Sequence, residues 1–359
     1  ELGKIPEDWD VCNLGSIGVP LMCKRIMKWQ TNETAGVPFY KIGTFGKQAD
    51  AFIAPDIWRY MITHFNYPRK GDILISAAGT IGRTVVFDGQ PSYFQDSNIV
   101  WINNDEEKVL NPYLEYAYTK VAWSTDASTI SRLYNSNLKS ALILFPHDKD
   151  EQQRIASALS DADALVAELD ALTEKKRAIM AGTMQELLTG KRRLQGFSEP
   201  WSEEVLRNHL SFLPGFPFTS DKFSKVACGP RLIRNRDLHS DDQVIYYTGE
   251  YSNQYIIENG DLLIGMDGDF TPCLWEKGNA VLNQRVGRII CKNTANIVFL
   301  YYLLQKPLAE LQESTGATTV KHLSHSTIEN MVCRVPKLAE QRAIASILSD
   351  MDAEIAELE

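Results

Sequence analysis

Few residues of this chain have the types and spacing that catalysis requires. His322 and His325 stand three apart, so two imidazoles could share one helix face, but no third zinc ligand is evident nearby. A magnesium-dependent nuclease needs clustered carboxylates near a lysine. The nearest such arrangement is 174–176 (Glu-Lys-Lys), which we expect on the solvated face of a helix. We therefore interpret these residues as polar surface, and we expect no metal and no catalytic residue.

Two further motifs resemble cofactor or substrate loops only in part. Gly79-Thr80-Ile81-Gly82 follows an expected strand, yet it lacks the Gly-Lys-Ser/Thr ending of a phosphate-binding loop and favours a turn. Asn111-Pro112-Tyr113 is one proline short of the Asn-Pro-Pro-Tyr of amino-methyltransferases, and no glycine-rich cofactor loop precedes it. Since no acid, base or nucleophile is duplicated either, the sequence favours a binding protein without cofactors.

What the chain does duplicate is a whole domain. Residues 151–169 return at 340–358 with an offset of 189 residues, and 71–75 (Gly-Asp-Ile-Leu-Ile) becomes 260–264 (Gly-Asp-Leu-Leu-Ile) at the same offset. This period is far longer than the roughly 20–50 residues of a solenoid repeat. The sequence therefore predicts two copies of one globular unit, each followed by a helix.

The composition sets broad limits on the fold and the partners. With 359 residues, 44% hydrophobic and 23% charged, the chain fits two ordinary globular domains with connecting helices. Its six cysteines form no Cys-x-x-Cys pair, so we expect reduced thiols. We find no signal peptide and no apolar run of membrane-spanning length, and we expect a cytoplasmic protein. A net charge of −9 argues mildly against nucleic acid, although basic clusters exist.

Short β-rich runs bounded by Gly, Asp and Asn predict α+β domains with curved sheets. We place the first domain at 1–148, a first spacer helix at 149–195, a second domain at 196–338 and a second, shorter helix at 339–359. The first helix should run for about 57 Å at 1.5 Å per residue, longer than one small domain can cover.

Apolar residues in the two helices step by four and three, which is typical of a coiled-coil seam. The alternative is an amphipathic helix lying on its own domain. The predicted seam residues are Ile155, Leu159, Ala162, Val166 and Leu169 in the first copy, and Ile344, Leu348, Met351, Ile355 and Leu358 in the second.

The two copies differ most in their polar turns. Segment 128–137 (Ser-Thr-Ile-Ser-Arg-Leu-Tyr-Asn-Ser-Asn) pairs with 318–327 (Thr-Thr-Val-Lys-His-Leu-Ser-His-Ser-Thr). Arg, Lys, Asn and Ser/Thr hydrogen-bond to base edges and phosphates. Two readers of different DNA sequences on one frame would show this pattern, although a solvated loop would show it too.

Taken together, these motifs resemble the specificity (S) subunits of type I restriction-modification systems, the HsdS family. The resemblance covers essentially the whole chain. It rests on the order and duplication of Pro-Glu-Asp-Trp at 6–9, the motifs at 71–75 and 79–82, Pro146 with Glu-Gln-Gln-Arg-Ile-Ala at 151–156, Leu-Leu-Thr-Gly-Lys-Arg-Arg-Leu at 187–194, and Pro-Lys-Leu-Ala-Glu-Gln-Arg at 336–342.

The resemblance implies two target recognition domains that each read half of a bipartite double-stranded DNA site, with the two helices paired antiparallel between them. A spacer of about 57 Å matches about 17 base pairs. It also implies docking of two modification (methyltransferase) subunits and recruitment of restriction subunits, with no site for S-adenosylmethionine or ATP. One departure is 266–270 (Met-Asp-Gly-Asp-Phe), which replaces the Gly-Thr-Ile-Gly turn, so contacts of Thr80 or Arg83 do not transfer to the second copy.

On this interpretation we expect a set of cationic and polar residues to face DNA. In the first domain they are Lys24, Arg25, Lys28, Arg83, Arg132, Tyr134, Asn135 and Asn137; in the second they are Lys222, Lys225, Arg231, Arg234, Arg236, Lys321 and His322. Two other hypotheses stay open at this point: a stand-alone metal-dependent nuclease or methyltransferase, and a coiled-coil scaffold without a DNA role.

Overall fold

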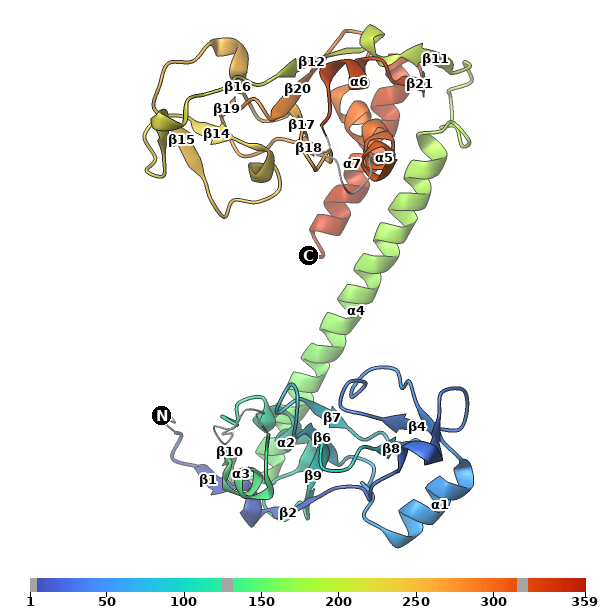
Figure 1. The fold of residues 1–359 in the computed structure, drawn as a ribbon, viewed down its shortest axis with the longest axis vertical. Helices are drawn as coiled ribbons and strands as arrows, with labels where there is room; N and C mark the ends of the chain where they lie inside the picture. The colour runs from blue at the N-terminus through green and yellow to red at the C-terminus, as the bar shows by residue number, and fades with distance from the viewer. Residues whose placement is uncertain (1–4, 124–131, 315–321) are drawn as a thin grey trace. The chain divides into compact units, whose positions relative to one another are not determined.

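The computed structural model describes residues 5–123, 132–314 and 322–359. The chain divides into two compact units, residues 1–167 (unit 1) and 168–359 (unit 2). Figure 1 shows that each unit mixes sheets with helices, as the α+β prediction requires.

Unit 1 is built from three small sheets. Their strand orders are β2-β9-β6-β7, β3-β5-β4-β8 and β1-β10, and all pairs are antiparallel except β4-β8. The strands are β1 (Trp9–Asn13), β2 (Gly18–Leu21), β3 (Thr31–Asn32), β4 (Val37–Tyr40), β5 (Phe52–Ile53), β6 (Ile73–Ser76), β7 (Thr84–Val86), β8 (Tyr93–Phe94), β9 (Ile99–Asn104) and β10 (Leu142–Pro146). The helices are α1 (Pro55–His64), α2 (Asn111–Tyr118), α3 (Asn135–Ser140) and the start of α4 (Lys149–Leu187).

Unit 2 repeats this plan with one more strand. Its sheets run β12-β20-β17-β18, β13-β15-β14-β19-β16 and β11-β21. The strands are β11 (Ser202–Val205), β12 (Leu210–Pro214), β13 (Phe223–Ser224), β14 (Arg231–Ile233), β15 (Ile245–Tyr247), β16 (Ile256–Ile257), β17 (Leu262–Gly265), β18 (Pro272–Leu274), β19 (Ala280–Leu282), β20 (Val286–Cys291) and β21 (Val332–Val335). The helices are the end of α4, then α5 (Ile297–Ser314), α6 (His325–Glu329) and α7 (Leu338–Ala356).

The repeated Gly-Asp-[Ile/Leu]-Leu-Ile motif forms a strand that serves two cores at once. Side chains alternate across a strand. Ile73 and Ile75 accordingly join the cluster beneath α2, whereas Leu74 joins the cluster of the second sheet. The glycine before this strand, Gly71, has φ +90°, a conformation that costs glycine little, and the Asp72 carboxylate caps the turn by accepting the Arg69 amide at 2.7 Å.

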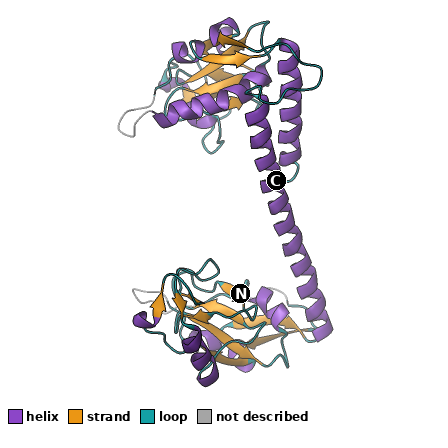
Figure 2. Ribbon diagram, turned by 90° about the vertical axis from the view of Figure 1, so that its right-hand side faces the viewer, coloured by secondary structure: helices purple, strands orange, loops and turns teal. Residues whose placement is uncertain are grey.

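The predicted long helix is confirmed: α4 spans Lys149–Leu187, and α7 spans Leu338–Ala356. Within unit 2 the two helices run antiparallel, because Lys176 pairs with Glu354 at 2.5 Å while Arg193, just beyond α4, pairs with Glu340 at the start of α7. Figure 2 shows the last turns of α4 beside α7.

The root of each helix is fixed by a buried glutamine. Gln152 is 0% exposed; its Nε2 donates to the carbonyl oxygens of Lys108 and Pro146, both at 2.9 Å, and its Oε1 accepts the Leu110 amide at 2.8 Å. The glutamine of the repeated Glu-Gln pair therefore joins helix to domain through main-chain groups.

The counterpart in unit 2 is Gln341, which is also 0% exposed. Its Nε2 donates to the carbonyl oxygens of Thr294 (3.1 Å) and Pro336 (2.9 Å), and its Oε1 accepts the Asn296 amide (2.9 Å). The joint is thus duplicated in full.

Two side-chain pairs reinforce this joint in both units. Trp9 Nε1 donates to Glu151 at 3.3 Å and Trp201 Nε1 donates to Glu340 at 3.1 Å. Further along α4 and α7, an aspartate of the repeat accepts a hydrogen bond from a tyrosine hydroxyl of α2 or α5. These pairs are Tyr116 with Asp163 (2.9 Å) and Tyr302 with Asp352 (2.5 Å).

Candidate nucleic-acid interface

An open groove of about 600 Å³ in unit 1 brings together three of the predicted DNA-facing cations, Arg25, Lys28 and Arg132. Arg25 Nε donates to the Asp96 carboxylate at 2.8 Å, and the arginine side chain stays 64% exposed. Lys28 belongs to a short turn braced by the side chain of Gln30, whose Oε1 accepts the Met27 amide at 2.9 Å. The groove thus holds cations of which Arg25 and Lys28 are exposed, together with the carboxylates of Glu33, Asp50 and Asp96.

Arg132 is held at this groove by main-chain and amide oxygens. Its Nη2 donates to the carbonyl oxygen of Ser97 at 2.6 Å and to Asn98 Oδ1 at 3.3 Å. Ser97 has φ +55°, one of two positive values for non-glycine residues in the described ranges. Such backbone strain concentrates at functional sites. Arg132 is therefore positioned by a strained turn rather than by a carboxylate.

The other predicted residues of unit 1 lie outside the set that lines this groove. The Lys24 ammonium stands 5.5 Å from the Phe65 ring centre, while Arg83 and Asn135 are exposed. Tyr134 is 48% exposed, but its amide donates to Asn137 Oδ1 at 2.9 Å. Asn137 therefore supports the first turn of α3.

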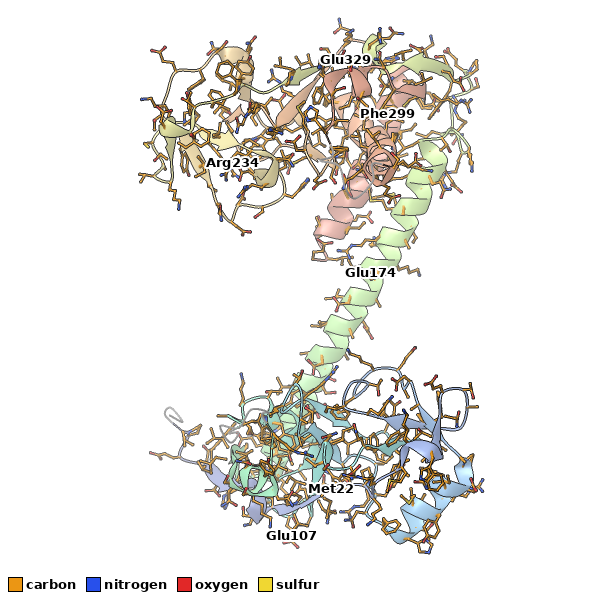
Figure 3. The ribbon with its side chains drawn as sticks, viewed as in Figure 1. Met22, Glu107, Glu174, Arg234, Phe299 and Glu329 are labelled. Atoms are coloured by element: carbon orange, nitrogen blue, oxygen red, sulfur yellow. The ribbon has the colours of Figure 1, made fainter. Side chains whose placement is uncertain are left out.

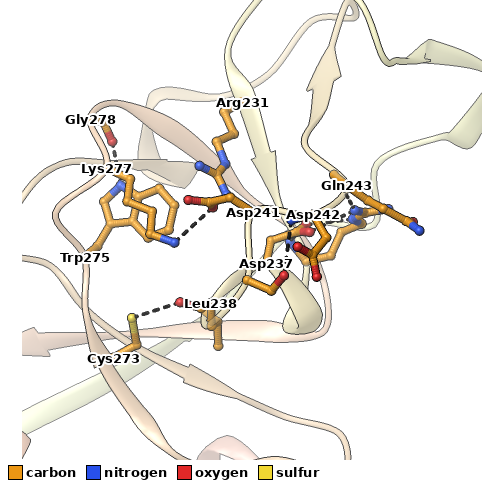
Figure 4. Close-up of polar contacts among 12 residues, drawn as sticks. Arg231, Asp237, Leu238, Asp241, Asp242, Gln243, Cys273, Trp275, Lys277 and Gly278 are labelled. Carbon is orange, nitrogen blue, oxygen red and sulfur yellow. Dashed lines mark hydrogen bonds and ion pairs between the residues drawn. The ribbon is translucent and has the colours of Figure 1, made fainter. Parts of the chain in front are cut away.

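In unit 2, two of the predicted arginines are engaged by nearby carboxylates. Figure 4 shows Arg231 beside Asp241 and Trp275. Arg231 pairs with Asp241, stacks on Trp275 with its guanidinium carbon 5.2 Å from the ring centre, and is only 13% exposed. Arg234 donates to both oxygens of Asp237 at 2.7 and 2.8 Å. These arginines brace the sheet of unit 2, so their charge is already matched within the domain.

The remaining predicted cations of unit 2 are Lys222, Lys225 and Arg236, and all three are exposed. His322 is also exposed, and its Nδ1 lies 2.8 Å from Asp267 Oδ1. Lys321 lies outside the described residues.

The seam residues predicted for the two helices differ in burial between the two copies. In the second copy Ile344, Leu348 and Ile355 are buried, and Met351 and Leu358 are partly buried. Ile344, Leu348, Met351 and Ile355 join a cluster with Met180 and Leu187 of α4.

In the first copy, Ile155 packs on its own domain, but the later seam positions are exposed. These are Leu159, Ala162, Val166 and Leu169. α4 meets α7 further along, through the Lys176–Glu354 pair and the cluster that holds Met180 and Leu187. The assignment of Leu159, Ala162, Val166 and Leu169 to a coiled-coil or partner surface therefore stays a prediction.

Sequence reasoning missed several polar residues of these surfaces. Lys41, Gln95 and Asn98 line the groove beside Arg132. In unit 2, Arg285 forms an ion pair with the same Asp267 that contacts His322. The repeat gave no signal for Asn98 or Arg285, because the fixed offset of 189 residues does not align them.

The residues considered above for metal binding or nucleophilic catalysis have the following surroundings in the described ranges. No three His, Cys, Asp or Glu residues converge as metal ligands there. Glu174, labelled in Figure 3, is exposed and pairs with Arg177 at 2.5 Å. All six cysteines are free, and burial raises the pKa of Cys23 to about 12, whereas a nucleophilic thiol needs a lowered pKa.

None of the helices in the described ranges is both long enough and apolar enough to cross a membrane.

With the duplicated domains and their helix roots established, the class of protein follows. Residues 6–178 and 221–359 match the type I restriction modification DNA specificity domain, and the chain belongs to this family.

Relatives extend the match. A type I restriction enzyme specificity subunit of Haemophilus influenzae is 53% identical over 166 residues, 46% of this chain and 43% of that protein. The EcoBI specificity subunit of Escherichia coli is 34% identical over 171 residues, 46% of this chain and 36% of that protein. The chain therefore aligns with less than half the length of these two relatives. The MjaX specificity subunit of Methanocaldococcus jannaschii is 22% identical over 98% of this chain and 88% of its own.

Solved structures share the fold. The type I restriction-modification S subunit of M. genitalium covers 100% of this chain and 92% of its own, with a TM-score of 0.66 and 17% identity. A chain from a type I system structure concerned with complex assembly and conformational transition gives a TM-score of 0.58 at 16% identity, over 99% and 93% of the two chains.

Proposed function

We propose that this chain is the DNA-recognition subunit of a type I restriction-modification complex, in which each unit reads one half of a bipartite site. The observation that carries the proposal is the contrast between the units. Their sheets and helix roots repeat, whereas their exposed cations do not: Arg25, Lys28 and Arg132 line a groove in unit 1, and Arg285 and His322 lie on the surface of unit 2. Phosphate contacts position such domains, and base contacts specify.

The catalytic work of the complex would then belong to other subunits. We infer that modification (methyltransferase) subunits, two in number, and restriction subunits assemble on this chain, which itself supplies no catalytic group. Such a complex belongs in the cytoplasm, where the free thiols of this chain stay reduced.

The exposed apolar residues of α4 in unit 1 are our candidate surface for the modification subunits. Leu165 and Val166 are 57% and 58% exposed, and Leu159 is 41% exposed. Changing Val166 to Glu should leave folding intact and weaken complex formation, because it places a charge in an apolar contact. Glu168→Gln, at an exposed polar position on the same helix, is the control.

The proposal is tested by combining the full chain with the modification subunit of its system and measuring methylation on a randomised duplex library. Methyl groups confined to a two-part motif with a fixed spacer are expected. DNA affinity should also fall by orders of magnitude as salt rises from about 50 to 200 mM, since phosphate contacts release counterions. Methylation without sequence preference would refute the proposal.

A further inference from the structure

Three chain segments meet beside the groove of unit 1 through main-chain hydrogen bonds. The Ala77 amide donates to the Asn98 carbonyl at 2.8 Å, and the Leu133 amide donates to the Ala77 carbonyl at 2.9 Å. Ala78 and Arg132 then face each other as an isolated antiparallel bridge. This arrangement fixes which side chains stand together at the surface.

The same arrangement occurs in unit 2. The Met266 amide donates to the Arg285 carbonyl at 2.9 Å, the Leu323 amide donates to the Met266 carbonyl at 2.8 Å, and Asp267 and His322 form the antiparallel bridge. The main-chain bonds therefore equate three positions in the two units: Ala78 with Asp267, Asn98 with Arg285, and Arg132 with His322. We call these the three matched positions.

The two units carry different side chains at all three matched positions. In unit 1 an arginine, Arg132, approaches the amide of Asn98, and the alanine between them adds nothing polar. In unit 2 the arginine comes from a different segment, Arg285, and an aspartate in the middle holds it. The two units share the same main-chain hydrogen bonds but carry Ala/Asn/Arg in unit 1 and Asp/Arg/His in unit 2. This is the pattern expected of two DNA-reading domains with different sequence preferences.

In the unit 2 cluster, the side chains of Arg285 and His322 project to solvent. The side chains of Arg285 and His322 are 55% and 56% exposed, whereas that of Asp267 is 22% exposed. Burial raises the pKa of Asp267, but hydrogen bonds from His322 and Arg285 outweigh this and leave the pKa lowered, so the carboxylate stays ionised at neutral pH. Asn235 holds the same turn by donating to the Asp267 carbonyl at 2.6 Å.

We propose that the three matched positions form the base-reading cluster of each unit, with Arg132 and Asn98 in unit 1 and Arg285 and His322 in unit 2 contacting base edges, and with Asp267 as a positioning residue. This inference rests on the proposed function. The chemical class of ligand is a purine edge in the major groove. An arginine fork donates two hydrogen bonds to O6 and N7 of guanine, and an asparagine amide pairs with N6 and N7 of adenine.

The neighbouring carboxylate and the strained turn orient the arginine of each unit before DNA binds. An unrestrained arginine loses side-chain freedom when it binds, and a fork that is already oriented loses less per hydrogen bond. Asp267 orients Arg285 in unit 2, and the carbonyl of Ser97, held at φ +55°, orients Arg132 in unit 1.

The test uses the full chain with its modification subunit, methylation of a randomised duplex library, and the motif recovered for each variant. Arg285→Ala should lower the base preference about tenfold or more at one position of one half-site and leave the other half-site unchanged. Asp267→Ala should relax that same position, and Asp267→Glu should restore part of the preference. Arg132→Ala should relax one position in the opposite half-site.

Lys306→Ala is the matched control, because Lys306 is an exposed cation of unit 2 on α5 that pairs with Glu310; it should leave the motif intact. If Asp267→Ala does not fold, the exposed Arg285→Ala variant still decides the matter. An unchanged motif, or an equal loss of methylation on all sequences, would overturn the base-reading role while leaving the proposed function standing. A wild-type complex with no two-part motif would instead remove the proposed function itself.

Discussion

The buried glutamine at each helix root predicts a large and unit-specific loss of stability. Replacing Gln341 with Met keeps the side-chain volume but removes all three of its hydrogen bonds, which leaves the carbonyls of Thr294 and Pro336 and the amide of Asn296 without their partner. A buried polar group left unpaired costs about 1–3 kcal/mol. Taking the lower end for each of the three groups gives about 3 kcal/mol.

This loss should be visible in thermal unfolding and in hydrogen exchange. For a domain of about 150–250 residues, 1 kcal/mol shifts Tm by about 2–4 °C, so the unit 2 transition should fall by about 6–12 °C. Exchange of the buried amides of β17 should accelerate, while that of β6 in unit 1 should not. Gln152→Met should give the reverse pattern.

Gln153→Met is the control, since Gln153 is the exposed neighbour of Gln152 and donates only to Ser157, at 3.3 Å. A loss below about 1 kcal/mol for Gln341→Met, or an equal loss in both units, would show that the glutamine is not the joint we describe.

Other predictions concern burial. Leu159 and Leu348 occupy the same position of the repeat, but they are 41% and 0% exposed; urea unfolding should therefore show about 2–5 kcal/mol lost for Leu348→Ala and less than about 0.5 for Leu159→Ala, and equal losses would contradict the structure. Burial raises the pKa of Cys23 from 9.0 to about 12. Its thiol should resist alkylation at pH 8 while exposed Cys228 reacts, as mass spectrometry would detect. Because the pKa of the Cys23 thiol is higher in the folded chain than in the unfolded one, its contribution to the free energy of unfolding is complete below about pH 9 and is lost between pH 9 and 12. Fast alkylation of Cys23 at pH 8 would refute the burial argument.

The repeat in the sequence predicted the duplicated α+β domains and the long helix because both depend on local patterns that the two copies share. The repeat did not predict which residues pack against each helix. Leu159 and Leu348 have identical spacing in their seams, yet Leu348 is buried in the core cluster of unit 2 while Leu159 is 41% exposed, and that difference depends on contacts far away in the chain.

The polar surfaces were predictable only where the residues are close in sequence to a shared motif. A basic run marked Arg231 and Arg234, but composition could not show that Asp241 and Asp237 already match their charges. Arg285 escaped notice because its equivalence to Asn98 exists only in main-chain hydrogen bonds.

The helix joint also bears on how such a protein can change over evolutionary time. The hydrogen bonds that Gln152 and Gln341 make to their domains go to carbonyl oxygens and amides, so this part of each joint depends on the course of the main chain. The tryptophan–glutamate and tyrosine–aspartate pairs add the requirement that these side chains stay in place. A domain that keeps its backbone and these pairs can therefore accumulate substitutions elsewhere on its surface without any change in the helix.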